Sequence, residues 1–225
     1  MKFQNLHPWN VSPKEAIAIQ NHLRPRIIKE DKFTNLRSLA SIDVGYKFGT
    51  DKAQAVVVVM QFPSLEIIET TNTRAPLTFP YIPGLLSFRE IPLILDAIKL
   101  LSHRPQLLIC DAHGIAHPRR FGLASHLGLI CDLPSIGVGK SCLVGQYKEV
   151  PLQRGSWQAL TSESEVIGAV LRTQNGINPV IISIGHRISL ITAIHITLLC
   201  IHKFRLPEPI RTAHHLAKTI TTPNI

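Results

Sequence analysis

Cysteine is scarce in this sequence, and its spacing excludes two kinds of structural site. The four cysteines are Cys110, Cys131, Cys142 and Cys200, and no two of them have CxxC spacing. Three of them sit in apolar runs. We therefore expect reduced, mostly buried thiols of an intracellular protein, and neither a disulfide framework nor a zinc site.

Long hydrophobic runs are also missing. The most apolar stretch, Ile188–Ile201, is shorter than the roughly 20 residues that a membrane helix needs. The first residues, MKFQNLHPWN, contain no apolar core of signal-peptide length. We expect a buried helix at residues 188–201, no membrane association and a cytoplasmic protein.

Negative charge is the third scarcity. The 225 residues contain 15 Asp and Glu against 24 Lys and Arg, which gives a formal net charge of +9. Hydrophobic residues make up 45% and charged residues 17%, so the chain is globular and not disordered. A basic balance fits a plain basic surface as well as a polyanionic partner, most often nucleic acid.

The order of apolar runs predicts an α/β fold. Residues 38–46, 55–62 and 65–74 are expected to form an antiparallel three-strand meander, followed by a helix, a strand at 107–110, a helix at 121–130 and a strand at 136–138. Two further strands (166–173, 179–184) and helices at 12–28, 188–204 and 211–220 complete the pattern. This indicates one domain, residues 1–225, with a mixed sheet flanked by helices.

Two carboxylates lie in apolar strand segments, where an acid is costly without a partner. Asp43 lies inside the first strand and Asp111 ends the strand at 107–110. Glu90 lies near the start of a helix that Ser87 could cap, so it is either a capping-box acid or a group that faces the sheet edge. Oxygen ligands of this kind suit magnesium or manganese better than zinc.

Cationic groups are expected near these acids. Lys140 follows the strand at 136–138, so it should lie at the same edge of the sheet as Asp111, and the last helix carries His214 and His215. Exposed histidines are surface residues by default, and a carboxylate cluster nearby would give one of them a catalytic role. On a basic protein, acids that bind a metal point to hydrolysis of phosphodiester bonds.

The loop at residues 78–90 (TFPYIPGLLSFRE) is stiffened by Pro80, Pro83 and Gly84. Tyr81 and Ile82 either pack into the core, as residue type alone favours, or project as a wedge that inserts between bases.

Five stretches together carry a family resemblance. The runs PYIPGLLSFRE, DAHGIAHPRRFGLASHLG, PSIGVGK, GHRIS and RLPEPIRTAH resemble endonuclease V, the deoxyinosine-directed repair nuclease of bacteria, and occur in order between Ile42 and His214. The resemblance implies a ribonuclease H-like fold. It also implies Mg²⁺-dependent nicking of DNA at the second phosphodiester bond 3′ to deoxyinosine, leaving 3′-hydroxyl and 5′-phosphate ends.

The resemblance assigns roles residue by residue. It makes Asp43, Asp111 and Glu90 the metal ligands, and Lys140 a contact to the scissile phosphate or leaving oxygen. His214, and not His215, assists proton movement or a second metal. The lesion pocket would contain Gly84, Leu85, Ala112, His113 and Gly114. The DNA-binding residues would be Pro80, Tyr81 (the wedge), Ile82, Pro83, Arg89, His117, Arg119 and Arg120.

Two departures and two alternatives accompany the resemblance. Ala112 stands where the family has glycine, which would weaken the pocket if the backbone there needs positive φ. No acid stands near Ile191, where the family usually has one.

The expected partner is single- or double-stranded DNA containing deoxyinosine, bound by a monomer. The alternatives are an endoribonuclease acting on inosine in RNA and a non-catalytic nucleic-acid-binding module.

Overall fold

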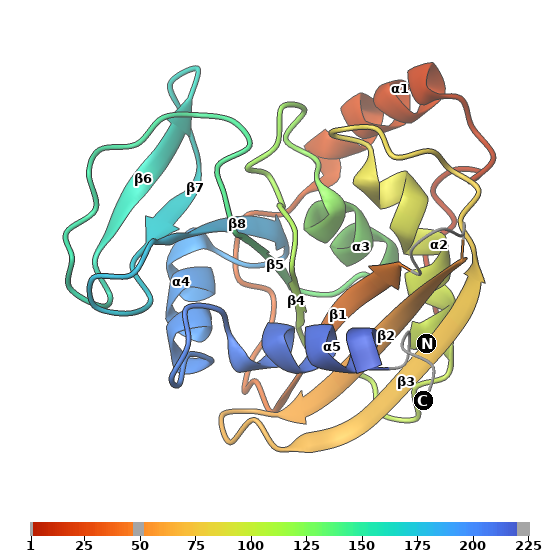
Figure 1. The fold of residues 1–225 in the computed structure, drawn as a ribbon. Helices are drawn as coiled ribbons and strands as arrows, with labels where there is room; N and C mark the ends of the chain where they lie inside the picture. Colours follow the sequence, from red (N-terminus) through yellow and green to blue (C-terminus); the bar gives the residue numbers. More distant parts are fainter. Residues whose placement is uncertain (1, 47–51, 220–225) are drawn as a thin grey trace.

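The chain forms an eight-stranded mixed sheet covered by helices (Figure 1). The computed structural model describes residues 2–46 and 52–219. The strands are β1 (Ser38–Tyr46), β2 (Lys52–Gln61), β3 (Ile67–Pro76), β4 (Leu108–Cys110), β5 (Ser135–Gly139), β6 (Trp157–Ser162), β7 (Glu165–Leu171) and β8 (Val180–His186). The helices are α1 (Pro13–Leu23), the 3₁₀ turn η1 (Arg24–Arg26), α2 (Leu86–Lys99), α3 (Leu123–Cys131), α4 (Leu190–Leu199) and α5 (Glu208–Thr219).

The strand order is β3-β2-β1-β4-β5-β8-β7-β6. Strands β1, β2 and β3 are antiparallel neighbours, whereas β1, β4 and β5 run parallel to one another. The predicted meander followed by parallel βα units is therefore confirmed. In the register, Ile42 lies beside Cys110 and Cys110 beside Gly137, so the residues that follow them reach the same sheet edge.

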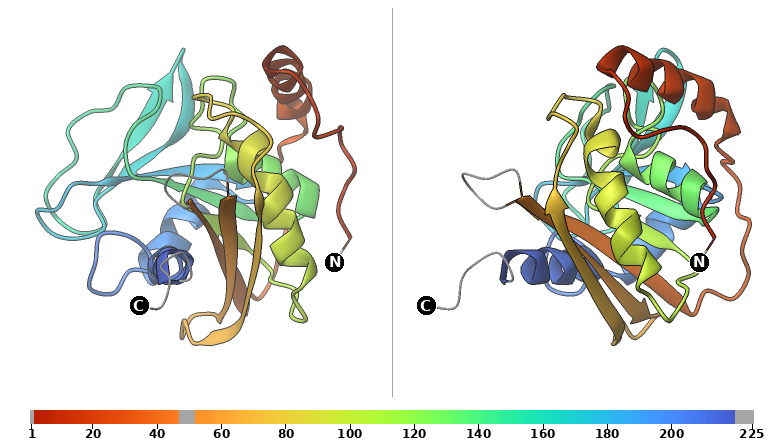
Figure 2. Two further views of the ribbon diagram at one scale, coloured as in Figure 1. Left: turned by 45° about the vertical axis from the view of Figure 1, so that its right-hand side comes forward. Right: turned by 90° about the vertical axis from the view of Figure 1, so that its right-hand side faces the viewer.

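The sheet is buried on both faces, because each face carries its own helices. The valines of β2 alternate: Val56 and Val58 pack in the cluster that contains α4 and α5, and Val57 and Val59 pack in the cluster that contains α2. Figure 2 shows α5 and α2 on opposite sides of the sheet. β-branched residues suit such a central strand because they pack well on a pleated surface.

Helix α5 approaches β1 closely at Gly45. A Cβ added to Gly45 would lie 2.8 Å from the carbonyl oxygen of Ala217, which is too close for any side chain. The missing side chain therefore lets α5 lie directly on β1. This contact brings the side chains of α5 to the end of the strand that carries Asp43.

Helix boundaries were predicted with mixed success. The capping box of α1 is present: the Ser12 side chain accepts from the Glu15 N–H, and the Glu15 carboxylate accepts from the Ser12 N–H. The helix ends at Leu23, earlier than the predicted 28, because η1 follows it. The last helix begins three residues earlier than predicted, and its predicted end at residue 220 lies outside the described residues.

The long apolar helix and one strand were predicted wrongly. The apolar run 188–204 contains only the short helix α4, and Ile191 on it is 62% exposed. An apolar run indicates that residues are buried, but it does not show that they are helical. Ile201, for example, is buried but lies beyond the end of α4. Strand β6 was missed because it is an edge strand whose only buried residue is Leu160, which leaves no alternating apolar pattern.

The prediction of reduced, mostly buried cysteines agrees with the structure. All four cysteines are free thiols, with Cys142 exposed and the other three buried. Over residues 2–46 and 52–219, no helix is long and apolar enough to cross a membrane.

Candidate active site

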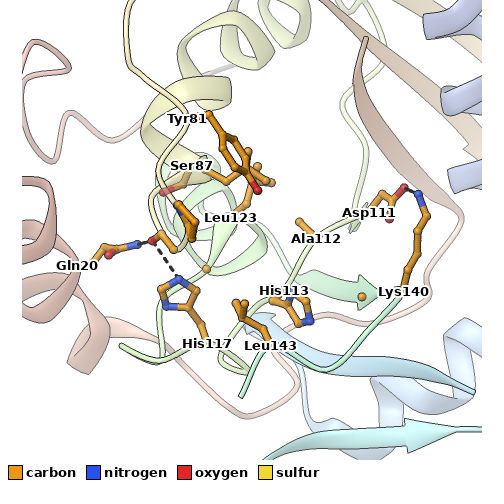
Figure 3. A pocket seen from close by; sticks show the side chains of 15 residues that line it. Gln20, Tyr81, Ser87, Asp111, Ala112, His113, His117, Leu123, Lys140 and Leu143 are labelled. Atoms are coloured by element: carbon orange, nitrogen blue, oxygen red, sulfur yellow. Dashed lines mark hydrogen bonds and ion pairs between the residues drawn. The ribbon is translucent and has the colours of Figure 1, made fainter. Parts of the chain in front are cut away.

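Three parallel strands deliver charged side chains to one edge of the sheet. Asp43 lies near the end of β1, Asp111 directly follows β4 and Lys140 directly follows β5. The Lys140 Nζ donates to Asp111 Oδ2 at 2.5 Å, as Figure 3 shows. The sequence prediction that a carboxylate and an ammonium meet at this edge is therefore correct.

Asp43 faces α5, where it meets His214. The His214 Nδ1 donates to Asp43 Oδ2 at 3.0 Å. Burial raises the pKa of Asp43, and the hydrogen bond and charge of His214 act in the opposite direction. Of the two adjacent histidines, the family resemblance selected His214. The structure places this histidine against Asp43.

Glu90 reaches the same edge from α2. The Tyr46 hydroxyl donates to the Glu90 carboxylate, and the Arg89 guanidinium lies 5.5 Å from the centre of the Tyr46 ring. Burial is the main cause that raises the pKa of Glu90 to about 7, and the charges of Asp43 and Asp111 raise it further. Like-charge repulsion therefore links the three acids.

Tyr46 is a site residue that we did not predict. A usable signal was its position in the strand. Successive side chains alternate between the faces of a sheet, so Tyr46 shares a face with Ile42 and Val44. Those two residues pack in the α2 cluster, which is where Glu90 lies.

Of the two alternatives for Glu90, the capping box at the start of α2 is wrong. The helix begins at Leu86 with Leu85 as its N-cap and with no side-chain hydrogen bond at the cap. Ser87 is inside the helix, 3.1 Å from Nδ1 of the buried His126. Glu90 consequently has no capping role and is directed to the sheet edge instead.

The three carboxylates line one small cavity of about 20 Å³. A space of this size holds roughly one water-sized atom. Their hard oxygen donors suit Mg²⁺ or Mn²⁺. As the side chains stand, however, no group of three or more His, Cys, Asp or Glu residues among the described residues is arranged to hold a metal ion. Each acid has a protein partner instead, and its role as a metal ligand stays a prediction.

A larger pocket of about 340 Å³ adjoins the acids. Its lining includes Tyr81, Gly84, Ala112 and His113, and Asp111 borders both hollows. In Figure 3 Ala112 and His113 lie between Tyr81 and His117 on one side and the Asp111–Lys140 pair on the other.

Two predicted pocket residues do not line this pocket. Leu85 is buried in a cluster with Phe79 and Phe88. Gly114 is buried where a Cβ would lie 2.0 Å from the carbonyl oxygen of Ile184, so it is a close-packing position. Their expected contact with a base is therefore not supported.

Alanine at position 112 fits the backbone without strain. Ala112 is absent from the described residues that have positive φ, and it lines the pocket. Its methyl group therefore changes the pocket wall and does not distort the chain.

The stiff loop presents one of its two expected side chains. Tyr81 is 69% exposed, as the wedge hypothesis requires. Ile82 instead packs, partly buried, against the cluster of Leu85 and Phe88. The expectation of a projecting Ile82 is therefore wrong, because the apolar side chain finds a core position.

The carbonyl oxygen of Gly84 anchors this loop. It accepts hydrogen bonds from Gln20 Nε2 at 3.0 Å, His117 Nε2 at 3.0 Å and Arg119 Nη2 at 2.7 Å. His117 is buried, which lowers the pKa of its imidazole to about 4, so the ring is neutral near pH 7. His117 and Arg119 thus position the loop, and their contact with DNA stays a prediction.

The other predicted DNA-binding arginines also have protein partners. Arg89 Nη1 donates to the Phe79 carbonyl at 2.5 Å. Arg120 Nε donates to the Glu165 carboxylate at 2.8 Å, and the Arg120 side chain is only 15% exposed. Phosphate contacts by these two side chains would have to compete with those bonds.

Buried neutral histidines predict a loss of stability in mild acid. Burial lowers the pKa of His117 and of His186 from 6.5 to about 4. The difference in bound protons between the unfolded chain and the fold therefore rises from about one at pH 6.5 to nearly two at pH 5, and stability falls as pH falls below 6.5. Between pH 6.5 and 5 these two groups remove about 3 kcal/mol. Glu90, whose pKa is raised to about 7, takes up a proton in the folded state over the same range. This uptake stabilises the fold by about 2 kcal/mol and opposes the loss.

We expect the free energy of unfolding to fall by at least about 1 kcal/mol from pH 6.5 to pH 5, measured by urea denaturation, because the buried His126, whose pKa is also lowered, adds to the loss. In Glu90→Gln the loss should grow to at least about 3 kcal/mol, since the opposing group is gone. A stability that stays constant or rises over this range would contradict the neutral, buried state of the two histidines.

Comparisons with known proteins agree on one family. A sequence model described as Endonuclease V matches residues 21–215. Endonuclease V of Trichormus variabilis is 48% identical over 96% of this chain and 99% of its own length, and that of Roseiflexus sp. is 52% identical over 93% and 94%.

Solved structures agree as well. Endonuclease V of Streptomyces avermitilis superposes with a TM-score of 0.89 at 39% identity, covering 94% of both chains. Endonuclease V of Ciona intestinalis, solved in complex with a 23mer DNA containing an inosine followed by a ribo-adenosine, gives a TM-score of 0.83 at 28% identity, covering 94% of this chain and 98% of that one.

Proposed function

The chain belongs to the endonuclease V family, and from this premise we propose that it is a DNA repair endonuclease acting on deoxyinosine. It nicks DNA at the second phosphodiester bond 3′ to the deaminated purine by Mg²⁺-dependent hydrolysis, leaving 3′-hydroxyl and 5′-phosphate ends. It acts as one domain, residues 1–225, and as a monomer. It acts in the cytoplasm, the location that the sequence predicts.

The observation that carries the proposal is the meeting of three carboxylates beside a pocket. Asp43, Glu90 and Asp111 come from three different elements and line one cavity. Burial and mutual repulsion raise the pKa of Glu90 to about 7, a cost that a divalent cation would relieve. A bound Mg²⁺ would neutralise charge on the scissile phosphate and lower the pKa of an attacking water.

The remaining groups take roles that fit their positions. Lys140, 46% exposed and directed at Asp111, donates to an oxygen of the scissile phosphate or to the leaving oxygen. His214 holds Asp43 in place and can move a proton at its imidazole. Tyr81 stacks on the bases next to the lesion, which leaves the adjoining pocket for the extruded base.

The test uses three end-labelled substrates of one sequence, with a single deoxyinosine, a single ribo-inosine or neither. We expect a nick in the deoxyinosine strand when magnesium is present, none with chelator, and none in the undamaged strand. Cleavage confined to the ribo-inosine strand would replace the proposal with an endoribonuclease. Binding without a nick in any strand would indicate a non-catalytic module.

A further inference from the structure

A second, larger hollow is lined in part by His214, the hydrogen-bond partner of Asp43. Its volume is about 490 Å³. Phe204, Arg205, Arg211, His214 and Lys218 are among its lining residues. It shares no lining residue with the pocket beside Tyr81.

The helix period explains why cations gather here. Positions 211, 214, 215 and 218 of α5 have the spacing i, i+3, i+4 and i+7, which forms one face of a helix. All four of those residues are cationic or protonatable and line the hollow. The opposite face, with Ile210, Ala213 and Ala217, is buried in the core. The solvent face of α5 is therefore a stripe of cationic and protonatable groups.

Two arginines are held in place at the hollow. Arg211 Nη1 donates to both Glu208 carboxylate oxygens, at 2.8 and 3.0 Å, and its guanidinium lies 3.4 Å from the centre of the Phe204 ring. Arg205 Nη2 donates to the carbonyl oxygen of Lys140 at 2.6 Å. The hollow is thus tied to the strand end that carries the active-site lysine.

The acids lie between the two hollows. Asp111 and Lys140 border the pocket beside Tyr81, while His214 borders the hollow and bonds to Asp43. We propose that this hollow binds the strand on the 3′ side of the scissile phosphate, through the next backbone phosphate. The inference rests on the proposed function: a base in the pocket and a nick on its 3′ side send the strand past the acids toward His214. Arg211 bonds to Glu208 through Nη1, so its Nε and Nη2 can donate two parallel hydrogen bonds to a phosphate.

The experiment compares two deoxyinosine duplexes of equal 5′ length. One continues for ten nucleotides beyond the scissile bond. The other ends two nucleotides 3′ of the deoxyinosine, so that the scissile phosphate is its last. For Arg211→Gln we expect the half-saturating enzyme concentration to rise about tenfold on the long duplex, with its salt slope reduced by about one. The truncated duplex should show no change.

A second variant should change the affinity for the long duplex in the opposite direction. Glu208→Gln removes the countercharge of Arg211, so the long duplex should bind more tightly and the truncated duplex equally well. This variant decides the question if Arg211→Gln does not fold. Lys99→Gln on α2, on the other face of the sheet, is the matched control and should change neither substrate.

Equal effects of Arg211→Gln on both duplexes, or no effect on either, would overturn the inference. If Arg211→Gln does not fold, wild-type binding of both duplexes by Glu208→Gln would overturn the inference. Failure of the wild-type protein to nick either duplex would instead refute the proposed function.

Discussion

Asp43→Asn should slow the nicking of deoxyinosine DNA by on the order of a thousandfold, because an amide cannot supply the negative oxygen that a divalent cation needs. Asparagine keeps the volume of the side chain and an oxygen that can accept from His214, whose Nδ1 lies 3.0 Å from Asp43 Oδ2. Binding of the deoxyinosine duplex should stay within about threefold of wild type, since base and backbone contacts remain. Single-turnover nicking and equilibrium binding measure the two quantities.

Asp96→Asn is the matched control for this experiment. Asp96 is an exposed carboxylate on α2 that pairs with Lys99 at 2.8 Å. Its loss also removes one negative charge, but Asp96 does not line the cavity of the three acids. Loss of DNA binding with intact turnover in Asp43→Asn, or equal loss of rate in both variants, would contradict a catalytic role for Asp43.

Gly84→Ala should damage the pocket through Arg119. Gly84 has φ of +81°, and a Cβ there would lie 2.7 Å from Arg119 Nη2, which donates to the Gly84 carbonyl. Positive φ alone costs about 1 kcal/mol for alanine. Displacing Arg119 would also release the loop that carries Tyr81. We expect the half-saturating enzyme concentration for deoxyinosine DNA to rise by about tenfold or more.

Gly155→Ala separates these two causes. Gly155 has φ of +86°, and a Cβ there meets nothing within 4 Å. It therefore suffers the same backbone strain without the collision. Gly84→Ala should lose at least as much unfolding free energy in urea as Gly155→Ala, and only Gly84→Ala should lose affinity for the lesion. Equal affinity in the two variants would show that the Gly84 anchor does not shape the pocket.

The parts of the fold that the sequence predicts well are those that leave a local pattern of residue types. The valine run of β2, the capping box of α1 and the alternation of strands and helices each leave a local pattern. Edge strand β6 and the end of α4 leave none, because one is mostly exposed and the other lies inside a continuous apolar run. Those elements are determined by tertiary contacts.

The site shows the same division. Asp111 and Lys140 could be placed together because each directly follows a strand, whereas Asp43, inside β1, was joined to them through the family resemblance. The partners of Gly84 could not be predicted from spacing, since Gln20, His117 and Arg119 come from distant segments. Basic side chains that the sequence suggested for DNA, such as Arg120, instead bond to protein carboxylates. Residue type indicates charge, and only the fold shows which charges are already paired.

The most direct test of the central claim is to map the nick on a duplex that contains one deoxyinosine, labelled at either end, with and without magnesium. The account predicts a magnesium-dependent break between the first and second nucleotides 3′ of the deoxyinosine, with 3′-hydroxyl and 5′-phosphate ends. A break at the lesion itself, or one that persists in chelator, would contradict the assignment of Asp43, Glu90 and Asp111 as a metal-dependent phosphodiesterase centre.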